Sequence, residues 1–196
     1  TVHDALKTDA LLIHPNVESY PGIHNYIKYQ NVCMEAKLHL GDVVAGFEEA
    51  DLFFEDIYDT HGQHHVALEP HACMADIDID GRITIWTGTQ QLSVCHAQVA
   101  MPLNVPMPQI RIIPAWIGGG FGGKLKAQFE PIIALLTSAT RKPVKLVLTR
   151  EEEFLTGKPR APYTITVRTG VRNDGTMVAR ELELLADVGA YADHVI

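Results

Sequence analysis

The stretch PAWIGGGFGGKLKA, Pro114–Ala127, holds five glycines within six residues and one phenylalanine among them. Glycine costs roughly 0.5–1 kcal/mol relative to alanine inside a helix or strand, so such a run indicates a specific backbone requirement. The residues before it, 109–117, have the pattern of a strand, and residues 124–142 have the pattern of a helix. This order directs backbone N–H groups and the positive end of a helix at the loop, which is typical of a site for an anionic or oxo-bearing ligand.

The loop can be compared with two phosphate-binding motifs. Gly118, Gly120 and Gly123 fit the GxGxxG spacing of a dinucleotide-binding Rossmann fold, and Glu151 lies near the end of the next strand. So many glycines match that spacing easily, however, and the flanking patterns are hairpins rather than βαβ units. A Walker loop is disfavoured because Lys124 is followed by leucine. An NAD(P)- or FAD-dependent Rossmann dehydrogenase, a glycine corner without ligand and a non-catalytic assembly module remain alternatives.

The rest of the chain predicts antiparallel hairpins. Asp-Gly dipeptides at 80–81 and 174–175 each lie between runs that alternate apolar and polar side chains, which is a strong hairpin signal. Other expected elements are helices starting after Asp42 and Ser93, a helix within 124–142 that Pro131 kinks or delays, and strands at 52–58, 109–117 and 143–150. The predicted fold class is α+β, with antiparallel hairpins and a mixed sheet packed with helices.

Composition excludes several classes of partner. The chain has 16 Lys and Arg against 24 Asp and Glu, a net charge of −8, and no basic block, so a nucleic-acid partner is not expected. No apolar run approaches the roughly 20 residues that span a bilayer, and we expect no membrane partner and a cytoplasmic location. The cysteines Cys33, Cys73 and Cys95 lie far apart without a CxxC pair, which predicts reduced, part-buried thiols.

The ends of the chain suggest a piece of a longer polypeptide, because it starts without methionine and stops within an apolar stretch. Residues 1–31 are rich in turn formers and are interpreted as a linker leading in from a preceding domain. Residues 32–196 are interpreted as the N-terminal part of one domain.

The glycine loop and three other stretches resemble the molybdenum hydroxylases, the xanthine dehydrogenase and aldehyde oxidase superfamily. These stretches, in the family's order and spacing, are QHHVALEPHACMADI (63–77), IWTGTQQLSVCHAQVA (85–100) and LTREEEFLTGKPRAPYTITVRTGV (148–171). The resemblance implies the first part of a molybdopterin-binding domain that holds molybdenum–molybdopterin, with the nucleotide form of the pterin left open. It also implies Fe–S clusters and FAD on other domains or subunits, and a complete enzyme that can be a homodimer. That enzyme would oxidise a purine-like aromatic heterocycle or an aldehyde with oxygen from water.

The resemblance also implies which residues bind the cofactor. Gln90 matches a glutamine whose amide donates to an oxo ligand of the metal, and an amide can do so without adding charge. Gly120, Phe121 and Gly122 match a Gly-Phe-Gly segment whose backbone approaches the cofactor, and Gly119 belongs to the same loop. Gln90 and the Phe121 N–H are expected nearest the metal. From the residues alone, Gln90 would be a capping or loop glutamine, whereas an ordinary core aromatic at Phe121 would need no such glycine neighbours.

Two further residues concern the substrate. Arg160 matches an arginine that faces the substrate in xanthine-type enzymes, where a guanidinium can stabilise developing negative charge; a surface arginine is the alternative. Ala161 stands where the family commonly has histidine, and Leu125 stands where xanthine dehydrogenases have a substrate-contacting glutamate. Leu125 disfavours xanthine, because an unpaired polar atom in a closed pocket costs about 1–3 kcal/mol. The catalytic glutamate of the family would lie beyond Ile196, so this chain alone is expected to be inactive.

Two charged groups have simpler interpretations. Glu151–Glu153 is predicted to be a solvated helix start. His64, His65 and His71 lie near Glu69, but their spacing gives no clean set of zinc ligands.

Overall fold

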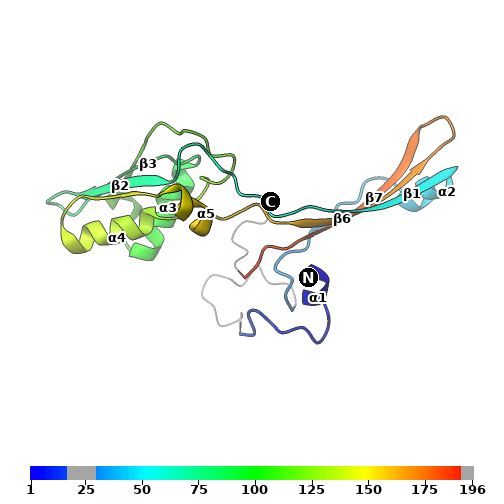
Figure 1. The fold of residues 1–196 in the computed structure, drawn as a ribbon, viewed down its shortest axis with the longest axis horizontal. Helices are drawn as coiled ribbons and strands as arrows, with labels where there is room; N and C mark the ends of the chain where they lie inside the picture. The colour runs from blue at the N-terminus through cyan, green and yellow to red at the C-terminus, as the bar shows by residue number, and fades with distance from the viewer. Residues whose placement is uncertain (17–29, 191–196) are drawn as a thin grey trace. The chain divides into compact units, whose positions relative to one another are not determined.

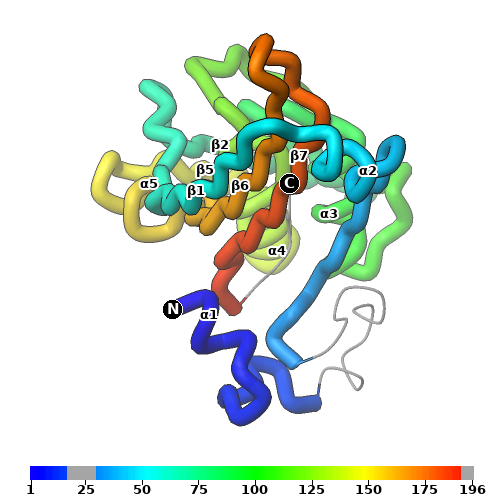
Figure 2. Tube along the Cα trace, turned by 90° about the vertical axis from the view of Figure 1, so that its right-hand side faces the viewer, coloured from blue at the N-terminus to red at the C-terminus, as the bar shows by residue number. Residues whose placement is uncertain are grey.

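The computed structural model describes residues 1–16 and 30–190 (Figures 1 and 2). The chain divides into two compact units, of which one is residues 64–160 and the other combines segments 1–63 and 161–196. Each unit is built around its own sheet. Within the described ranges, no helix has both the length and the apolar character needed to cross a bilayer.

The unit of residues 64–160 contains a four-stranded mixed sheet. In spatial order its strands are β4 (Ile110–Pro114), β3 (Ile83–Thr87), β2 (Ala72–Ile77) and β5 (Val144–Val147). β2 and β3 form the antiparallel hairpin predicted around residues 80–81, and Gly81 takes the positive φ of +85° that the turn requires. β3 and β4 are parallel, whereas β5 is antiparallel to β2. The prediction of a hairpin within a mixed sheet is confirmed.

Two helices pack against this sheet and against each other (Figure 1). α3 (Leu92–Leu103) joins β3 to a short 3-10 helix, η2 (Met107–Gln109), which precedes β4. α3 begins after Gln91, so Ser93 lies inside the helix and is not its cap as predicted. α4 (Glu130–Thr140) carries Pro131 in its first turn, where a missing N–H is harmless; the late start is confirmed and the kink is not found.

The core of this unit lies between the sheet and the two helices. Alternate residues of β3 are buried, and Ile85 is fully buried. The buried residues that pack together in this core are Cys73, Ala75, Ile83, Ile85, Cys95, Val99, Ala100, Ile110, Ile133 and Ala134. Burial, together with the nearby Glu130, raises the pKa of Cys73 and of Cys95 to about 12, which keeps both thiols protonated. All three cysteines are free, as predicted.

The other unit contains a three-stranded antiparallel sheet in the order β1-β6-β7 (Figure 2). These strands are β1 (Leu52–Asp59), β6 (Tyr163–Val171) and β7 (Met177–Ala186). β6 and β7 form the hairpin predicted around residues 174–175. α1 (Val2–Ala5) and α2 (Val43–Glu48) belong to the same unit. Asp42 caps α2 as predicted, because its carboxylate accepts the N–H of Ala45. The boundary between a linker 1–31 and a domain 32–196 stays a prediction, and residues 17–29 of that linker lie outside the described residues.

The connection through the glycine loop is not a Rossmann βαβ unit. β4 precedes the loop and β5 follows it, but the two strands lie at opposite edges of the sheet with β3 and β2 between them. The fingerprint requires adjacent parallel strands, so the Rossmann alternative is not supported. The helix after the loop starts late, as Pro131 predicted: α4 begins only at Glu130, so its N-terminus does not directly follow the loop.

Candidate functional site

The glycine loop, residues 118–123, contains a tight turn. The N–H of Gly123 donates to the carbonyl oxygen of Gly120 over 2.8 Å. The two residues between them both have positive φ, +52° at Phe121 and +95° at Gly122, as in a type I′ turn. Because positive φ is uncommon in residues other than glycine, Phe121 is held in an unfavourable backbone conformation at the centre of the loop. Such outliers persist where the surrounding structure imposes them.

Two other glycines are required by close packing against side chains. A Cβ on Gly118 would lie 2.6 Å from the Cβ of Glu69, and a Cβ on Gly120 would lie 2.5 Å from the Cδ and Oε1 atoms of Gln90. Both distances are far shorter than a normal van der Waals contact. The glycine run therefore lets Glu69 and Gln90 approach the main chain, in addition to shaping the loop for a ligand. The sequence interpretation did not include these two side-chain contacts.

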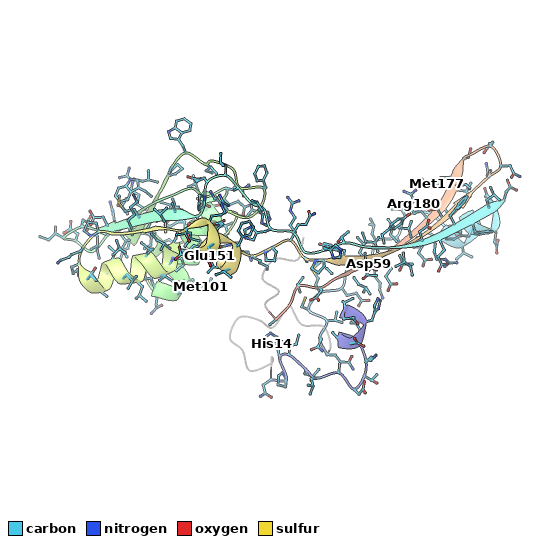
Figure 3. All side chains as sticks on the ribbon, in the orientation of Figure 1. His14, Asp59, Met101, Glu151, Met177 and Arg180 are labelled. Atoms are coloured by element: carbon cyan, nitrogen blue, oxygen red, sulfur yellow. The ribbon has the colours of Figure 1, made fainter. Side chains whose placement is uncertain are left out.

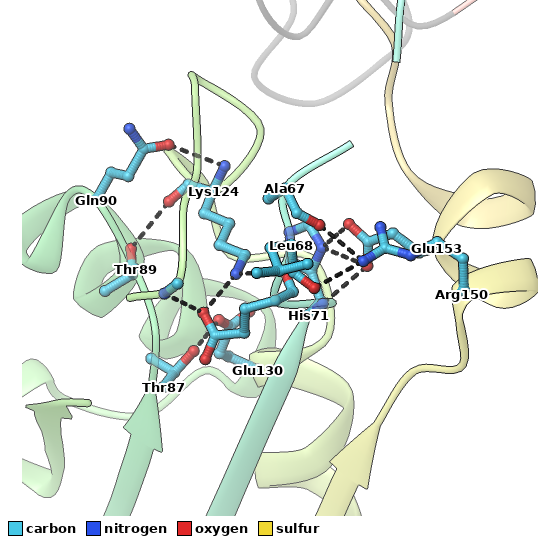
Figure 4. Close-up of polar contacts among 12 residues, drawn as sticks. Ala67, Leu68, His71, Thr87, Thr89, Gln90, Lys124, Glu130, Arg150 and Glu153 are labelled. Atoms are coloured by element: carbon cyan, nitrogen blue, oxygen red, sulfur yellow. Dashed lines mark hydrogen bonds and ion pairs between the residues drawn. The ribbon is translucent and has the colours of Figure 1, made fainter. Parts of the chain in front are cut away.

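Gln90 is held on the loop by hydrogen bonds at both its backbone and its side chain, and Figure 4 shows the one that joins its side chain to Lys124. Its Oε1 accepts the N–H of Gly122 and the N–H of Lys124, each over 3.1 Å, and its own N–H donates to the carbonyl of Lys124 over 2.8 Å. Two donors at one end of the amide fix that end as the oxygen. The Nε2 group therefore faces away from these bonds, and it has no acceptor among residues 1–16 and 30–190.

Three successive loop N–H groups are also available to a ligand. The N–H groups of Gly119, Gly120 and Phe121 donate to no residue in the described part of the chain, although Gly120 is buried. Successive amides in a turn with left-handed residues form a concavity suited to an anion or an oxo group. The side chain of Gln90 packs on Gly120 of the same loop and adds its Nε2 as a further donor, so these residues suit a cofactor that presents oxygen atoms. The structure thus brings Gln90 and Phe121 together at one loop, as the sequence hypothesis requires.

Both residues predicted to concern the substrate also lie at the loop. Leu125 packs beside Gly122, and Nη2 of Arg160 donates to the carbonyl oxygen of Phe121 over 3.0 Å. Arg160 and the side chain of Phe121 are exposed. The guanidinium therefore contacts the loop backbone itself, a contact that the sequence did not indicate.

A buried lysine lies behind the loop. The side chain of Lys124 is only 3% exposed, and its Nζ donates to the Oε2 of Glu69 over 2.7 Å and to the carbonyl of Glu69 over 2.9 Å (Figure 4). Burial acts to raise the pKa of Glu69, but hydrogen bonds from Lys124 and from the N–H of Gly118 outweigh it and lower the pKa below its ordinary value. Sequence reasoning missed this pair, because nothing in the local pattern connects the two residues.

α5 (Arg150–Thr156) fixes the segment that leads into β2. Glu153 is buried and accepts both the N–H of His71 and its Nδ1, each over 2.8 Å, while Nη2 of Arg150 donates to the carbonyls of Ala67 and Leu68. The prediction of a solvated helix start is therefore wrong for Glu153, which faces inward. In the two described ranges no three of the His, Cys, Asp and Glu side chains are grouped to hold a metal ion.

The environment of Glu153 predicts a pH-dependent stability. Burial acts to raise its pKa, but the hydrogen bonds from His71 outweigh it, so the pKa lies below the ordinary value of 4.5. A lowered folded-state pKa stabilises the fold above the ordinary pKa, and this contribution is lost as the pH falls through the folded value. Glu153→Gln should therefore flatten the loss of unfolding free energy between about pH 6 and about pH 3, measured by urea unfolding.

Glu151→Gln is the matched control, because Glu151 is exposed on the same helix (Figure 3). It should leave the pH dependence of the parent chain unchanged. Equal pH profiles for the two variants would contradict the prediction.

Comparison with known proteins gives a family. The model of the molybdopterin cofactor-binding domain matches residues 23–196. The nicotinate dehydrogenase large molybdopterin subunit of Eubacterium barkeri is 39% identical over 177 residues, which cover 90% of this chain and 41% of the relative. The xanthine dehydrogenase molybdenum-binding subunit of Escherichia coli O157:H7 is 34% identical over 165 residues, which cover 84% of this chain and 22% of the relative. The chain thus spans less than half the length of either relative.

Solved structures share the fold. The aldehyde oxidoreductase from Desulfovibrio gigas matches with a TM-score of 0.80 at 24% identity, covering 93% of this chain and 19% of that one. The CO dehydrogenase from Oligotropha carboxidovorans matches with a TM-score of 0.79 at 26% identity, covering 95% of this chain and 24% of that one. The predicted α+β class is confirmed by these matches.

Proposed function

Because the chain belongs to the family of molybdopterin cofactor-binding domains, as its motifs predicted, we propose that it is part of a molybdenum-dependent hydroxylase. The complete enzyme oxidises an aromatic heterocycle or an aldehyde with oxygen derived from water. The observation that carries this proposal is the row of three N–H groups without partners in the described chain, in the loop on which the side chain of Gln90 packs. When bound, the molybdenum–molybdopterin cofactor supplies the two-electron redox chemistry.

In this proposal the loop and Gln90 hold the oxygen-bearing face of the cofactor. The N–H groups of Gly119, Gly120 and Phe121 and the Nε2 of Gln90 act as donors, with Gln90 and Phe121 nearest the metal. Gly122 contributes differently, because its N–H is already donated to Gln90 and its positive φ shapes the turn. All these donors are neutral, so they bind oxygen atoms without changing the net charge around an anionic group.

Arg160 and Leu125 are the proposed substrate residues. One nitrogen of Arg160 bonds the carbonyl of Phe121, and a guanidinium has five N–H donors, so the others can face a substrate carbonyl or carboxylate. Leu125 offers an apolar wall in place of a hydrogen-bonding partner. This pair favours a heterocycle with few polar substituents, or an aldehyde, over a dioxopurine.

The remaining parts of the enzyme lie on other domains or subunits. The relatives are named as a molybdopterin subunit and a molybdenum-binding subunit, and this chain matches 41% and 22% of their lengths. From the resemblance to the molybdenum hydroxylases, we propose that iron–sulfur and FAD-bearing domains or subunits accept the electrons. A cytoplasmic location belongs to the same proposal.

Metal analysis and turnover of the complete enzyme test this function. The enzyme, co-expressed with its neighbouring subunits, should contain stoichiometric molybdenum and pterin. It should reduce a dye with nicotinate or benzaldehyde faster than with xanthine. Absence of molybdenum together with absence of turnover would instead support the non-catalytic assembly module.

A further inference from the structure

We propose that Lys124 and Glu69 form a clamp that positions the amide of Gln90 toward the cofactor. The clamp consists of these two residues alone. The inference rests on the proposed function, and it assigns a positioning role to an ion pair behind the glycine loop. Neither residue needs to touch substrate or cofactor for this role.

Lys124 holds Gln90 at both its backbone and its side chain, and Gly122 adds one bond to the side chain. Its backbone N–H donates to the Oε1 of Gln90 over 3.1 Å, and its carbonyl accepts the N–H of Gln90 over 2.8 Å. The same carbonyl accepts the hydroxyl of Thr89 over 3.3 Å. The position of the Gln90 amide therefore follows the position of the Lys124 backbone.

The side chain of Lys124 fixes that backbone through Glu69. Its buried Nζ contacts both the Oε2 and the carbonyl oxygen of Glu69. The Oε2 atom of Glu69 also accepts the N–H of Gly118 over 2.8 Å, and the N–H of Glu69 donates to the carbonyl of Gly118 over 3.1 Å. One carboxylate oxygen thus joins the first residue of the glycine loop to the residue that follows it.

This arrangement restricts the conformational freedom of the glycine loop. Five glycines leave many backbone conformations open, and fixing each of these residues costs conformational entropy. Closing both ends of the loop on one carboxylate reduces that freedom before any ligand binds. Donors that are already in place cost no reorganisation during the reaction. The clamp therefore preorganises Gln90, whereas an ion pair that only stabilised the fold would not need to contact both ends of the loop.

The test uses the complete, metal-loaded enzyme with Lys124→Met and with Lys145→Met as the matched control. Methionine keeps most of the length of lysine and removes the ammonium group, and Lys145 is exposed on β5 of the same unit. Lys124→Met should lower kcat for benzaldehyde about 10–100-fold, as loss of outer-shell partners does, while KM changes less than about threefold. It should also alter the Mo(V) electron paramagnetic resonance spectrum after dithionite reduction. Lys145→Met should match the parent enzyme in both.

A parent-like spectrum and kcat in folded Lys124→Met enzyme would overturn the inference. If that variant does not fold, Glu69→Gln decides by the same two readouts, because it keeps the size of the side chain and removes its charge.

If the parent enzyme contains no molybdenum, the proposed function fails and the clamp is tested separately on the apo protein. Lys124→Met should then speed amide hydrogen exchange in the peptide 116–126, and an unchanged exchange rate would overturn the clamp.

Discussion

Replacing Gln90 by glutamate is expected to leave the chain folded and to lower the turnover of the complete enzyme by about 10²–10³-fold, the usual cost of losing one preorganised donor. A carboxylate oxygen can accept the same two N–H groups, of Gly122 and Lys124, that now hold Oε1. The loop should therefore keep its conformation. The variant loses the Nε2 donor. It also adds a negative charge beside the proposed cofactor, which is already anionic. The measurement is kcat together with molybdenum content and the circular dichroism spectrum.

Gln91→Glu is the control for the added charge. Gln91 is the next residue, it is exposed, and as the N-cap of α3 it makes no side-chain capping bond. An acidic residue at a helix N-terminus is tolerated or slightly stabilising, so this variant should retain normal turnover. Equal turnover of the Gln90→Glu enzyme and the parent would show that the Nε2 group does not act as a donor in the reaction.

The parts of the fold that the sequence predicted are those set by local chemistry. The two Asp-Gly turns fix their hairpins because both runs that pair lie within a few residues of the turn. Asp42 caps its helix through an N–H three residues away. Pro131 is tolerated in the first turn of a helix but not in its interior, so an uninterrupted helix cannot run through it from the loop. Each signal depends only on neighbours in the sequence.

The parts that were missed depend on distant residues. Lys124 and Glu69 are 55 residues apart, and Glu153 and His71 are 82 residues apart. No pattern of spacing or alternation encodes which charge meets which across such separations. Glu153 was for that reason interpreted as solvated, although it is buried against His71.

The late start of α4, which Pro131 predicted, is supported by hydrogen bonds in the segment before it. The N–H groups of Gln128 and Phe129 donate to the carboxylate of Glu130, and the N–H of Ala127 donates to the side chain of Gln98. These bonds satisfy the backbone without a helix. The residues between the loop and α4 therefore stay irregular because side-chain acceptors, the adjacent Glu130 and the distant Gln98, take the place of helical hydrogen bonds.

The candidate site was predicted only in part. Physical reasoning on the glycine run led to a set of backbone donors, and the resemblance added Gln90, which would otherwise be an ordinary loop glutamine. The structure adds why the two belong together. Gln90 packs so closely on Gly120 that any side chain there would displace it. The glycine is therefore needed for the position of Gln90 as well as for the approach of a ligand.

From that contact we expect Gly120→Ala to lower turnover while leaving the unfolding free energy nearly unchanged. Gly120 does not have a positive φ, so alanine carries no backbone strain there. The added Cβ meets the end of the Gln90 side chain at 2.5 Å, and a flexible side chain can move aside. The Oε1 of Gln90 then loses the hydrogen bonds from the N–H groups of Gly122 and Lys124. We expect turnover to fall about 100-fold, the effect of a misplaced group, while the unfolding free energy changes by less than about 1 kcal/mol.

Alanine substitutions at two other glycines of the site, Gly88 and Gly119, are the controls for this prediction. Gly88→Ala should leave both turnover and stability unchanged, because its Cβ would meet no atom closer than 3.5 Å. Gly119→Ala should destabilise the loop itself, because the φ of Gly119 is +98° and an alanine there is strained. Enzyme kinetics and urea unfolding of the three variants distinguish these cases. Full turnover in Gly120→Ala enzyme would mean that the position of the Gln90 amide does not limit the reaction, and the donor role proposed for it would then be untenable.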